Sequence, residues 1–300
     1  MSMIKLNANT IKVIAEQISF TTGYDFDVQT TQSISGGDIN AAFRFQGVSS
    51  SYFVKLNHAN RQAMFEAEFM GLQALTETST VAVPKPLVHG VTDDVSFLIL
   101  EYLTLMRTTS ASERVLGQQL AQLHLKRQPH FGWHIDNTIG STNQPNARSN
   151  NWVNFWREQR LGFQLQLAAK NGYSSRLQSL GEKLCEQLGD FFVDYKPQPS
   201  LLHGDLWVGN SASIAGNLPV IFDPACYFGD RETDLAMTEL FGGFGRDFYA
   251  AYNDVWQLDA GYKTRKTLYN LYHILNHVLL FGGSYVSQAE KMMQNLLKEL

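Results

Sequence analysis

Two stretches of the sequence hold the side chains best suited to chemistry. Leu201–Asn210 reads LLHGDLWVGN, and Val220–Asp223 (VIFD) ends thirteen residues after Asn210. In each stretch an aspartate, Asp205 or Asp223, lies just beyond an apolar strand, where side chains emerge into a cleft. Two carboxylates and the Asn210 carboxamide form an all-oxygen ligand set that suits Mg²⁺. Either stretch alone is also typical of a turn or a strand end, but the ordered pair favours phosphoryl transfer, which uses an aspartate base beside an Asn and Asp metal pair.

A lysine and a glutamate near the N-terminus form a second set. Lys55 lies in the middle of a predicted strand (FVKL, 53–56), and Glu68 follows thirteen residues later. At 100° per residue, Glu68 falls on the apolar face of its predicted helix, whereas Glu66 falls at the edge of that face. A carboxylate on an apolar face needs a partner, and Lys55 is the obvious one. Such an ion pair would present the lysine to ATP phosphates; without Glu68, Lys55 would be interpreted as a solvated strand lysine.

Two further segments are weaker indications of a nucleotide site. The turn Ser35-Gly36-Gly37-Asp38 could cover phosphates, although it does not match G-x-G-x-x-G, and Gly-Gly turns occur in many hairpins. Phe97–Leu103 (FLILEYL) is an apolar strand whose backbone groups could bind the edge of adenine. A simple core strand is an equally good interpretation of it.

The elements that must position these residues divide the chain in two. In the first hundred residues we expect a mostly antiparallel sheet with one long internal helix, from helices at 8–19 and 60–75, strands at 27–33, 42–45 and 51–56, and a hairpin of 88–91 and 97–103. From Ser110 the pattern is nearly all helical, beginning with an expected capping box, Ser110-Ala-Ser-Glu113. Short strands at 201–203 and 220–222 interrupt it, and further helices are expected to begin near residues 150, 177, 231, 246, 264 and 284. This change predicts an α+β fold with a small sheet lobe, 1–103, and a larger helical lobe, 104–300.

Composition restricts the classes of protein. The chain has 300 residues, of which 44% are hydrophobic and only 17% charged, with a net charge of −4. This is ample for a sizeable core and argues against disorder driven by charge. No basic surface pattern indicates nucleic acid or a membrane as a partner. Two cysteines without a CxxC motif, and an N-terminus without the apolar region of a signal peptide, favour a cytoplasmic protein.

In order along the chain, these residues resemble those of the protein-kinase-like fold. Within it, the sequence closely resembles the fructosamine kinase (ketosamine 3-kinase) family. The matching motifs run from about residue 30 to 285 and are GGDIN (36–40), FEAE (65–68), LGQQLAQLH (116–124), FGW (131–133), DNTIG (136–140), FWREQRL (155–161), HGDLW (203–207), DPACYFGDRE (223–232), DLAM (234–237) and LFGGF (240–244). Trp207, in HGDLW, separates this family from aminoglycoside and choline kinases.

The resemblance implies a bilobal protein-kinase-like fold and ATP-dependent phosphorylation of the 3-hydroxyl of a ketosamine, the sugar adduct of an amine. In the family, the phosphate makes the adduct labile, so that glycation is repaired. Carried onto this chain, the resemblance implies Asp205 as the base, Asn210 and Asp223 as Mg²⁺ ligands, and Lys55 with Glu68 as the phosphate anchor. The residues implied to hold adenine through their backbone are Glu101, Tyr102, Leu103 and Thr104. Pro-Ala after Asp223, with no APE segment downstream, argues against a protein kinase.

Other residues keep two interpretations. Trp207 could stack on a sugar or pack the loop. Asp230 and Arg231 could contact the substrate or belong to a charged helix start. His203 is expected to orient the catalytic loop. The residues expected to be structural are His124, Trp133, Trp152, Trp156, His273 and His277.

Other functions stay open at this point. A related kinase could use an aminoglycoside, an amino alcohol or another sugar as acceptor. A nucleotide-binding module without turnover is disfavoured because the five polar residues of the two sets are intact. A metal-dependent hydrolase using His203 and Asp205 lacks a second histidine cluster. The sequence leaves open the sugar, the type of amine and the oligomeric state.

Overall fold

A five-stranded antiparallel sheet forms most of the first hundred residues. The computed structural model describes residues 6–35, 39–92, 94–173 and 176–300. The strands lie in the order β1-β2-β3-β5-β4. Their bounds are β1 (Thr30–Ile34), β2 (Ala41–Gln46), β3 (Ser51–His58), β4 (Pro86–Val91) and β5 (Val95–Glu101). The expected Gly36-Gly37 turn lies outside the described residues.

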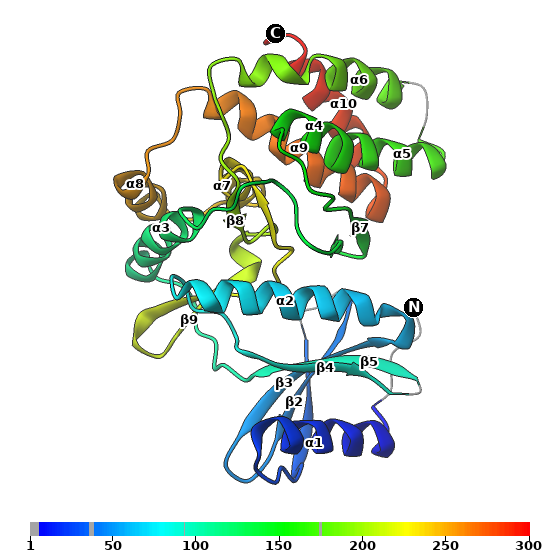
Figure 1. The fold of residues 1–300 in the computed structure, drawn as a ribbon, viewed down its shortest axis with the longest axis vertical. Coiled ribbons are helices and arrows are strands. Elements are labelled where there is room, and N and C mark those ends of the chain that lie inside the picture. The colour runs from blue at the N-terminus through cyan, green and yellow to red at the C-terminus, as the bar shows by residue number, and fades with distance from the viewer. Residues whose placement is uncertain (1–5, 36–38, 93, 174–175) are drawn as a thin grey trace.

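Two helices cover the opposite faces of this sheet: α1 (Ala8–Thr22) and α2 (Gln62–Thr78) (Figure 1). Because successive strand side chains point to opposite faces, β5 contributes apolar side chains to the packing on both faces of the sheet. Phe97 and Ile99 pack in the cluster that contains the α1 isoleucines, and Leu98 and Leu100 pack with Phe65 and Leu72 of α2. Lys55 pairs with Leu98 across β3 and β5, which places the lysine on the α2 side.

Several expected boundaries were wrong in detail. β1 begins three residues after the expected residue 27 and β5 ends at Glu101, two residues before the expected end. The long helix expected from residue 60 begins at Gln62, since Asn60 lies in the 3₁₀ turn η1 (Ala59–Arg61), and among the described residues no side chain caps α2. At α1, by contrast, Asn7 accepts a hydrogen bond from the Thr10 N–H at 2.8 Å, as an N-cap residue should.

The second part of the chain is mainly helical. Its helices are α3 (Ser110–His124), α4 (Trp152–Trp156), α5 (Gly162–Lys170), α6 (Arg176–Glu186), α7 (Glu232–Leu240), α8 (Arg246–Val255), α9 (Tyr262–Phe281) and α10 (Ser284–Leu296), with the π-helical turn η2 (Arg157–Leu161) and the 3₁₀ turns η3 (Leu188–Phe192), η4 (Val208–Asn210) and η5 (Ala215–Asn217). The largest buried cluster joins α4–α7 with α9 and α10. No helix in the described ranges is both long and apolar enough to cross a membrane.

The capping box at α3 lies one residue earlier than expected. Thr109, not Ser110, is the N-cap: its Oγ1 accepts the Ser112 N–H at 3.2 Å, and the Ser112 Oγ accepts the Thr109 N–H at 2.8 Å. The Glu113 carboxylate, expected to close the box, instead accepts the Gly245 N–H at 2.7 Å before α8. The side chain therefore connects α3 to α8.

Among its described residues, this second part contains three small two-stranded sheets. β8 (Ser200–Leu202) pairs with β11 (Tyr227–Gly229), β9 (Ser211–Ile214) with β10 (Leu218–Ile221), and β6 (Asn137–Ile139) with β7 (Thr142–Gln144). β8 and β10 match the two expected strands. They carry the two stretches that contain Asp205 and Asp223 to the same region.

The crossing of α3 and α8 provides a test of the packing. A Cβ atom at Gly117 of α3 would overlap the backbone carbonyl of Phe248 in α8, and backbone cannot move aside as a side-chain tip can. We expect Gly117→Ala to lower the free energy of unfolding by about 1–3 kcal/mol, measured by urea denaturation. Gly189→Ala is the control, because no atom lies within 4 Å of a Cβ there; an equal loss in both variants would contradict the packing argument.

Candidate active site

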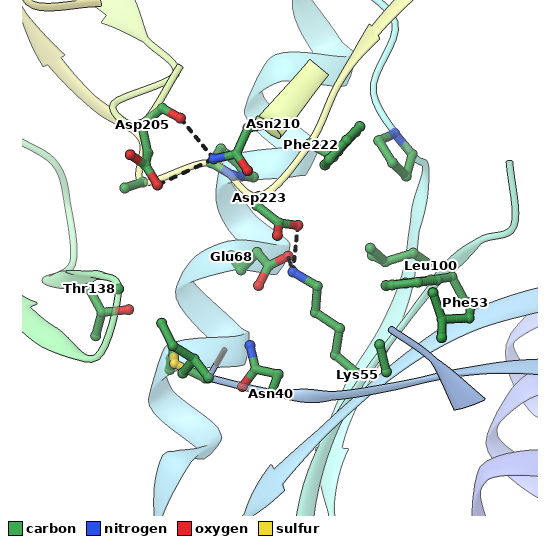
Figure 2. Close-up of a pocket in the computed structure, with 18 of the residues that line it drawn as sticks. Asn40, Phe53, Lys55, Glu68, Leu100, Thr138, Asp205, Asn210, Phe222 and Asp223 are labelled. Atoms are coloured by element: carbon green, nitrogen blue, oxygen red, sulfur yellow. Dashed lines mark hydrogen bonds and ion pairs between the residues drawn. The ribbon is translucent and has the colours of Figure 1, made fainter. Parts of the chain in front are cut away.

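A cavity of about 420 Å³ lies between the five-stranded sheet and the helical part (Figure 2). Residues from β2, β3, α2, the end of β5, the β6–β7 hairpin and the loops after β8 and β10 line it. Eight of the residues singled out from the sequence are among the lining residues: Lys55, Glu68, Glu101, Leu103, Asp205, Trp207, Asn210 and Asp223.

Lys55 contacts two carboxylates at once. Its Nζ lies 2.6 Å from Glu68 Oε1 and 2.6 Å from Asp223 Oδ1 (Figure 2). Burial alone lowers the pKa of an ammonium group, but the facing carboxylates of Asp223 and Glu68 outweigh it and raise the pKa of Lys55. The lysine therefore stays charged, although its side chain is only 7% exposed. The expected Lys55–Glu68 pair is present, and the structure adds Asp223 to it.

Asp205 and Asn210 face each other across their loop. The Asn210 Nδ2 donates to the backbone oxygen of Asp205 at 2.9 Å and to its Oδ2 at 3.3 Å. Burial, followed by the charge of Asp223, raises the pKa of the Asp205 carboxyl to about 7, while the bond from Asn210 opposes this rise. Groups with such pKa values suit proton transfer near neutral pH.

Asp234 of α7 holds the loop that carries Asp205 through hydrogen bonds to its backbone. The two Asp234 oxygens accept the backbone N–H groups of His203 and Gly204, each at 2.8 Å, and His124 lies 3.1 Å from the same carboxylate. A charge-assisted bond of this kind is stronger than a neutral one. Gly204 has φ of 84°, and a Cβ there would overlap the Ala225 carbonyl, so this tight approach requires glycine.

His203 joins this loop to the one that carries Asp223. Its Nε2 lies 3.0 Å from the carbonyl oxygen of Phe222, which can only accept a hydrogen bond. Its Nδ1 accepts the Asp205 N–H at 3.3 Å. One ring nitrogen donates and the other accepts, as in a neutral imidazole, and burial lowers the pKa of His203 accordingly. The histidine is placed to orient the loop.

Asp223 has a left-handed backbone, with φ of 59°. Such conformations in residues other than glycine are costly and occur at functional sites. Its side chain is 48% exposed and faces the cavity. One carboxylate oxygen binds Lys55, and among the described residues neither Asp223 Oδ2 nor Asn210 Oδ1 accepts a hydrogen bond. These free oxygens, with the Asp205 carboxylate, fit the preference of Mg²⁺ for oxygen donors.

The segment after β5, expected from the resemblance to hold adenine, borders one side of the cavity. Glu101 and Leu103 line the cavity, together with Phe53 and Leu100. Tyr102 and Thr104 are not among the lining residues, and the Tyr102 ring lies 4.4 Å below the Arg44 guanidinium.

Asp230 and Arg231 lie outside the cavity. Asp230 is fully buried and accepts hydrogen bonds from Tyr195 at 2.9 Å and Tyr269 at 2.5 Å. Arg231 donates to the backbone oxygens of Trp256 and Gln257. The structure thus brings neither side chain to Asp205.

Four of the residues expected to be structural, namely His124, Trp133, Trp152 and Trp156, have such contacts. His124 is fully buried and lies 2.8 Å from the Tyr252 hydroxyl. Trp152 and Trp156 pack in the largest buried cluster, with Trp133 against it. In the described part of the chain, no three His, Cys, Asp or Glu side chains form a metal cluster, so nothing there adds to the hydrolase interpretation.

The β6–β7 hairpin is the part of the site that sequence patterns missed. Asn137, Thr138 and Gly140 line the cavity opposite the sheet, and Figure 2 shows Thr138 directed toward it. Asn137 donates to the Cys226 carbonyl at 2.8 Å, which ties the hairpin to the loop after Asp223. The motif DNTIG, residues 136–140, was the available signal.

Glu68 provides a test of the lysine contacts. We expect Glu68→Gln to raise KM for ATP, the nucleotide expected from the sequence, about tenfold, because Lys55 then faces one carboxylate charge in place of two. The matched control is Glu66→Gln on the same helix, where the side chain is exposed. Steady-state kinetics measures both, and equal KM values for the two variants would contradict the role of Glu68.

Comparisons with known proteins agree with this geometry. The family described as "Fructosamine kinase" matches residues 10–299. A Synechocystis sp. protein named "Probable ketoamine kinase" is 47% identical over 289 residues, covering 96% of this chain and 97% of that protein. "Protein-ribulosamine 3-kinase, chloroplastic" of Arabidopsis thaliana is 41% identical over 283 residues, covering 93% and 86%.

A solved structure shows the same fold. A Haemophilus somnus protein, named as a candidate fructosamine-3-kinase, superimposes with a TM-score of 0.87 at 30% identity, covering 95% of this chain and 96% of that one. The predicted α+β, protein-kinase-like fold is therefore confirmed.

Proposed function

This chain belongs to the fructosamine kinase family, and we propose that it transfers the γ-phosphoryl group of ATP to the 3-hydroxyl of a ketosamine. One observation supports this most: Lys55 binds both Glu68 and Asp223 in the cavity where Asp205 and Asn210 also lie. An anchored lysine beside a carboxylate base is the arrangement that phosphoryl transfer needs. The proposed product breaks down and releases the amine, which repairs glycation.

Each polar residue has a distinct role in this proposal. Asp205 accepts the proton of the attacking hydroxyl, and Asn210 holds the Asp205 carboxylate in place. Lys55 binds phosphate oxygens, and Glu68 orients Lys55. Asn210 and Asp223 would hold Mg²⁺, which neutralises charge on the phosphates when it is bound.

The two parts of the chain have different roles in this proposal. We assign residues 1–103 to nucleotide binding, with adenine held by the backbone of Glu101 and Leu103, the two residues of the expected segment that line the cavity, and residues 104–300 to catalysis and acceptor binding. Trp207 lines the cavity beside Asp205 and is placed to stack on the sugar. Cys185 and Cys226 are both free thiols, which suits the reducing cytoplasm.

Mass spectrometry tests the proposal directly. The protein is incubated with Mg²⁺, ATP and a panel of ribulosyl and fructosyl amines, with Asp205→Asn as control. A mass increase of one phosphate on an adduct, made only by the wild-type protein, is the expected result and ranks the two sugars. ATP binding without phosphorylation of any adduct would contradict the acceptor and direct the search to other hydroxyl compounds.

A further inference from the structure

A row of aromatic side chains runs from the cavity to the protein surface. We call Trp207, Phe241, His277, Phe281 and Tyr285 the aromatic row. Ring centroids lie 5.9 Å apart for Trp207 and Phe241, 5.2 Å for Phe241 and His277, and 5.3 Å for His277 and Phe281. Tyr285 lies 4.9 Å from His277. Because Trp207 lines the cavity, the row is continuous with the site described above.

The β6–β7 hairpin connects the same surface to the cavity. Gly140 lines the cavity, and its Cβ position lies 3.4 Å from a methyl group of Leu280 in α9. The Asn276 amide of α9 donates to the Ile139 carbonyl at 3.2 Å. The C-terminal end of α9 therefore lies beside the β6–β7 hairpin (Figure 1), which lines the cavity.

The outer rings are exposed, which is unusual for large apolar groups in contact with one another. Phe281 is 62% exposed and Phe241 is 36% exposed. Two glycines with positive φ, Gly282 and Gly283, end α9 directly after Phe281, and a Cβ at Gly282 would lie 2.7 Å from the Tyr173 hydroxyl. This restricted turn fixes the position of Phe281 at the outer end of the aromatic row.

The chemistry of the row favours a cationic ligand with apolar stems. Aromatic faces attract ammonium groups, and the C-terminal end of the 20-residue helix α9 carries a partial negative charge. Two polar atoms of this helix end, Asn276 Oδ1 and His277 Nδ1, are buried without a hydrogen-bond partner among the described residues. Asn276 is only 3% exposed, so its unpaired oxygen adds a buried partial negative charge to this helix end.

We propose that the aromatic row binds the amine-bearing part of the substrate, namely the lysine side chain and adjoining peptide of a glycated polypeptide. This inference rests on the proposed function. A cavity of about 420 Å³ lies in the lower part of the size range for pockets that hold one drug-sized ligand, so a nucleotide and a sugar together leave no room in it for the amine-bearing part. The secondary ammonium next to the sugar then lies where the cavity opens onto the aromatic row, and the lysine methylenes lie on the outer rings of the row.

Kinetics with two acceptors tests this inference. The acceptors carry the same sugar, one on methylamine and the other on the lysine of a short peptide. We expect Phe281→Ser to raise KM for the glycated peptide about 5- to 20-fold, the range for losing the burial of one or two lysine methylenes, with KM for the methylamine adduct, which lacks these methylenes, changed less than twofold. Phe281→Tyr keeps a ring and should behave as wild type. Phe20→Ser is the matched control, because Phe20 is 87% exposed on α1.

The possible outcomes are distinct. Equal changes for the two acceptors, or no change for the peptide, would overturn the inference while leaving the proposed function intact. A variant altered only in its oligomeric state, by size-exclusion chromatography, would assign the row to contacts between copies of the chain and overturn it too. If the wild-type protein phosphorylates neither acceptor, the proposed function fails. Calorimetric binding of the glycated peptide then decides the inference, which is overturned by equal affinity of the wild type and Phe281→Ser.

Discussion

Asp205→Asn is expected to lower kcat by about 10²–10⁴-fold, the contribution typical of a positioned general base. The carboxamide has nearly the same shape as the carboxylate, so the loop should keep its bonds to Asp234. It cannot, however, accept the proton of the attacking hydroxyl at neutral pH. Because Asp205 is not bonded to Lys55 in the structure, we expect nucleotide affinity to change by less than threefold.

Single-turnover kinetics and equilibrium nucleotide binding separate these two effects. The matched control is Asp194→Asn, an exposed aspartate, which should leave both quantities unchanged. If Asp205→Asn lost affinity and turnover in equal proportion, Asp205 would act in binding, and its assignment as base would be wrong.

The contacts of Lys55 show which parts of the site can be predicted from the local sequence pattern and which cannot. The Lys55–Glu68 pair was predictable because both residues lie on regular elements, whose side-chain directions follow from spacing alone. The contact between Lys55 and Asp223 joins residues 168 positions apart. No local pattern encodes such a contact, since it depends on how the sheet and the helical part pack together.

The same distinction explains the parts that were missed. Strands of three residues, such as β6 and β7, are too short to show alternation. Asn137 and Gln144 hold this hairpin through side-chain hydrogen bonds to each other and to the Ala225 and Cys226 carbonyls, which apolar periodicity does not report. The role of Asp234 was missed for the same reason. In the sequence it is one more acidic residue near the start of a helix, and only the tertiary structure brings its carboxylate to the backbone N–H groups of His203 and Gly204.

Asp223→Asn is expected to weaken the binding of Mg²⁺-ATP by at least about 100-fold. Loss of a group that only supports a metal ligand costs 10- to 100-fold in metal affinity, and Asp223 is proposed as a ligand itself. The variant also removes one of the two carboxylates that hold Lys55. Asparagine is preferred to alanine for this test because it tolerates the left-handed backbone at this position, so that strain does not confuse the result.

Titration of ATP into the wild-type and variant proteins, with Mg²⁺ and then with EDTA, isolates the contribution of the metal. The wild-type affinity should fall when Mg²⁺ is removed, whereas the variant affinity should be low and nearly independent of Mg²⁺. Asp223 would be excluded as a metal ligand if the variant kept the wild-type response to Mg²⁺. In that case the loss of affinity is equal with and without Mg²⁺, and it assigns Asp223 to the positioning of Lys55 alone, because that contact does not depend on the metal.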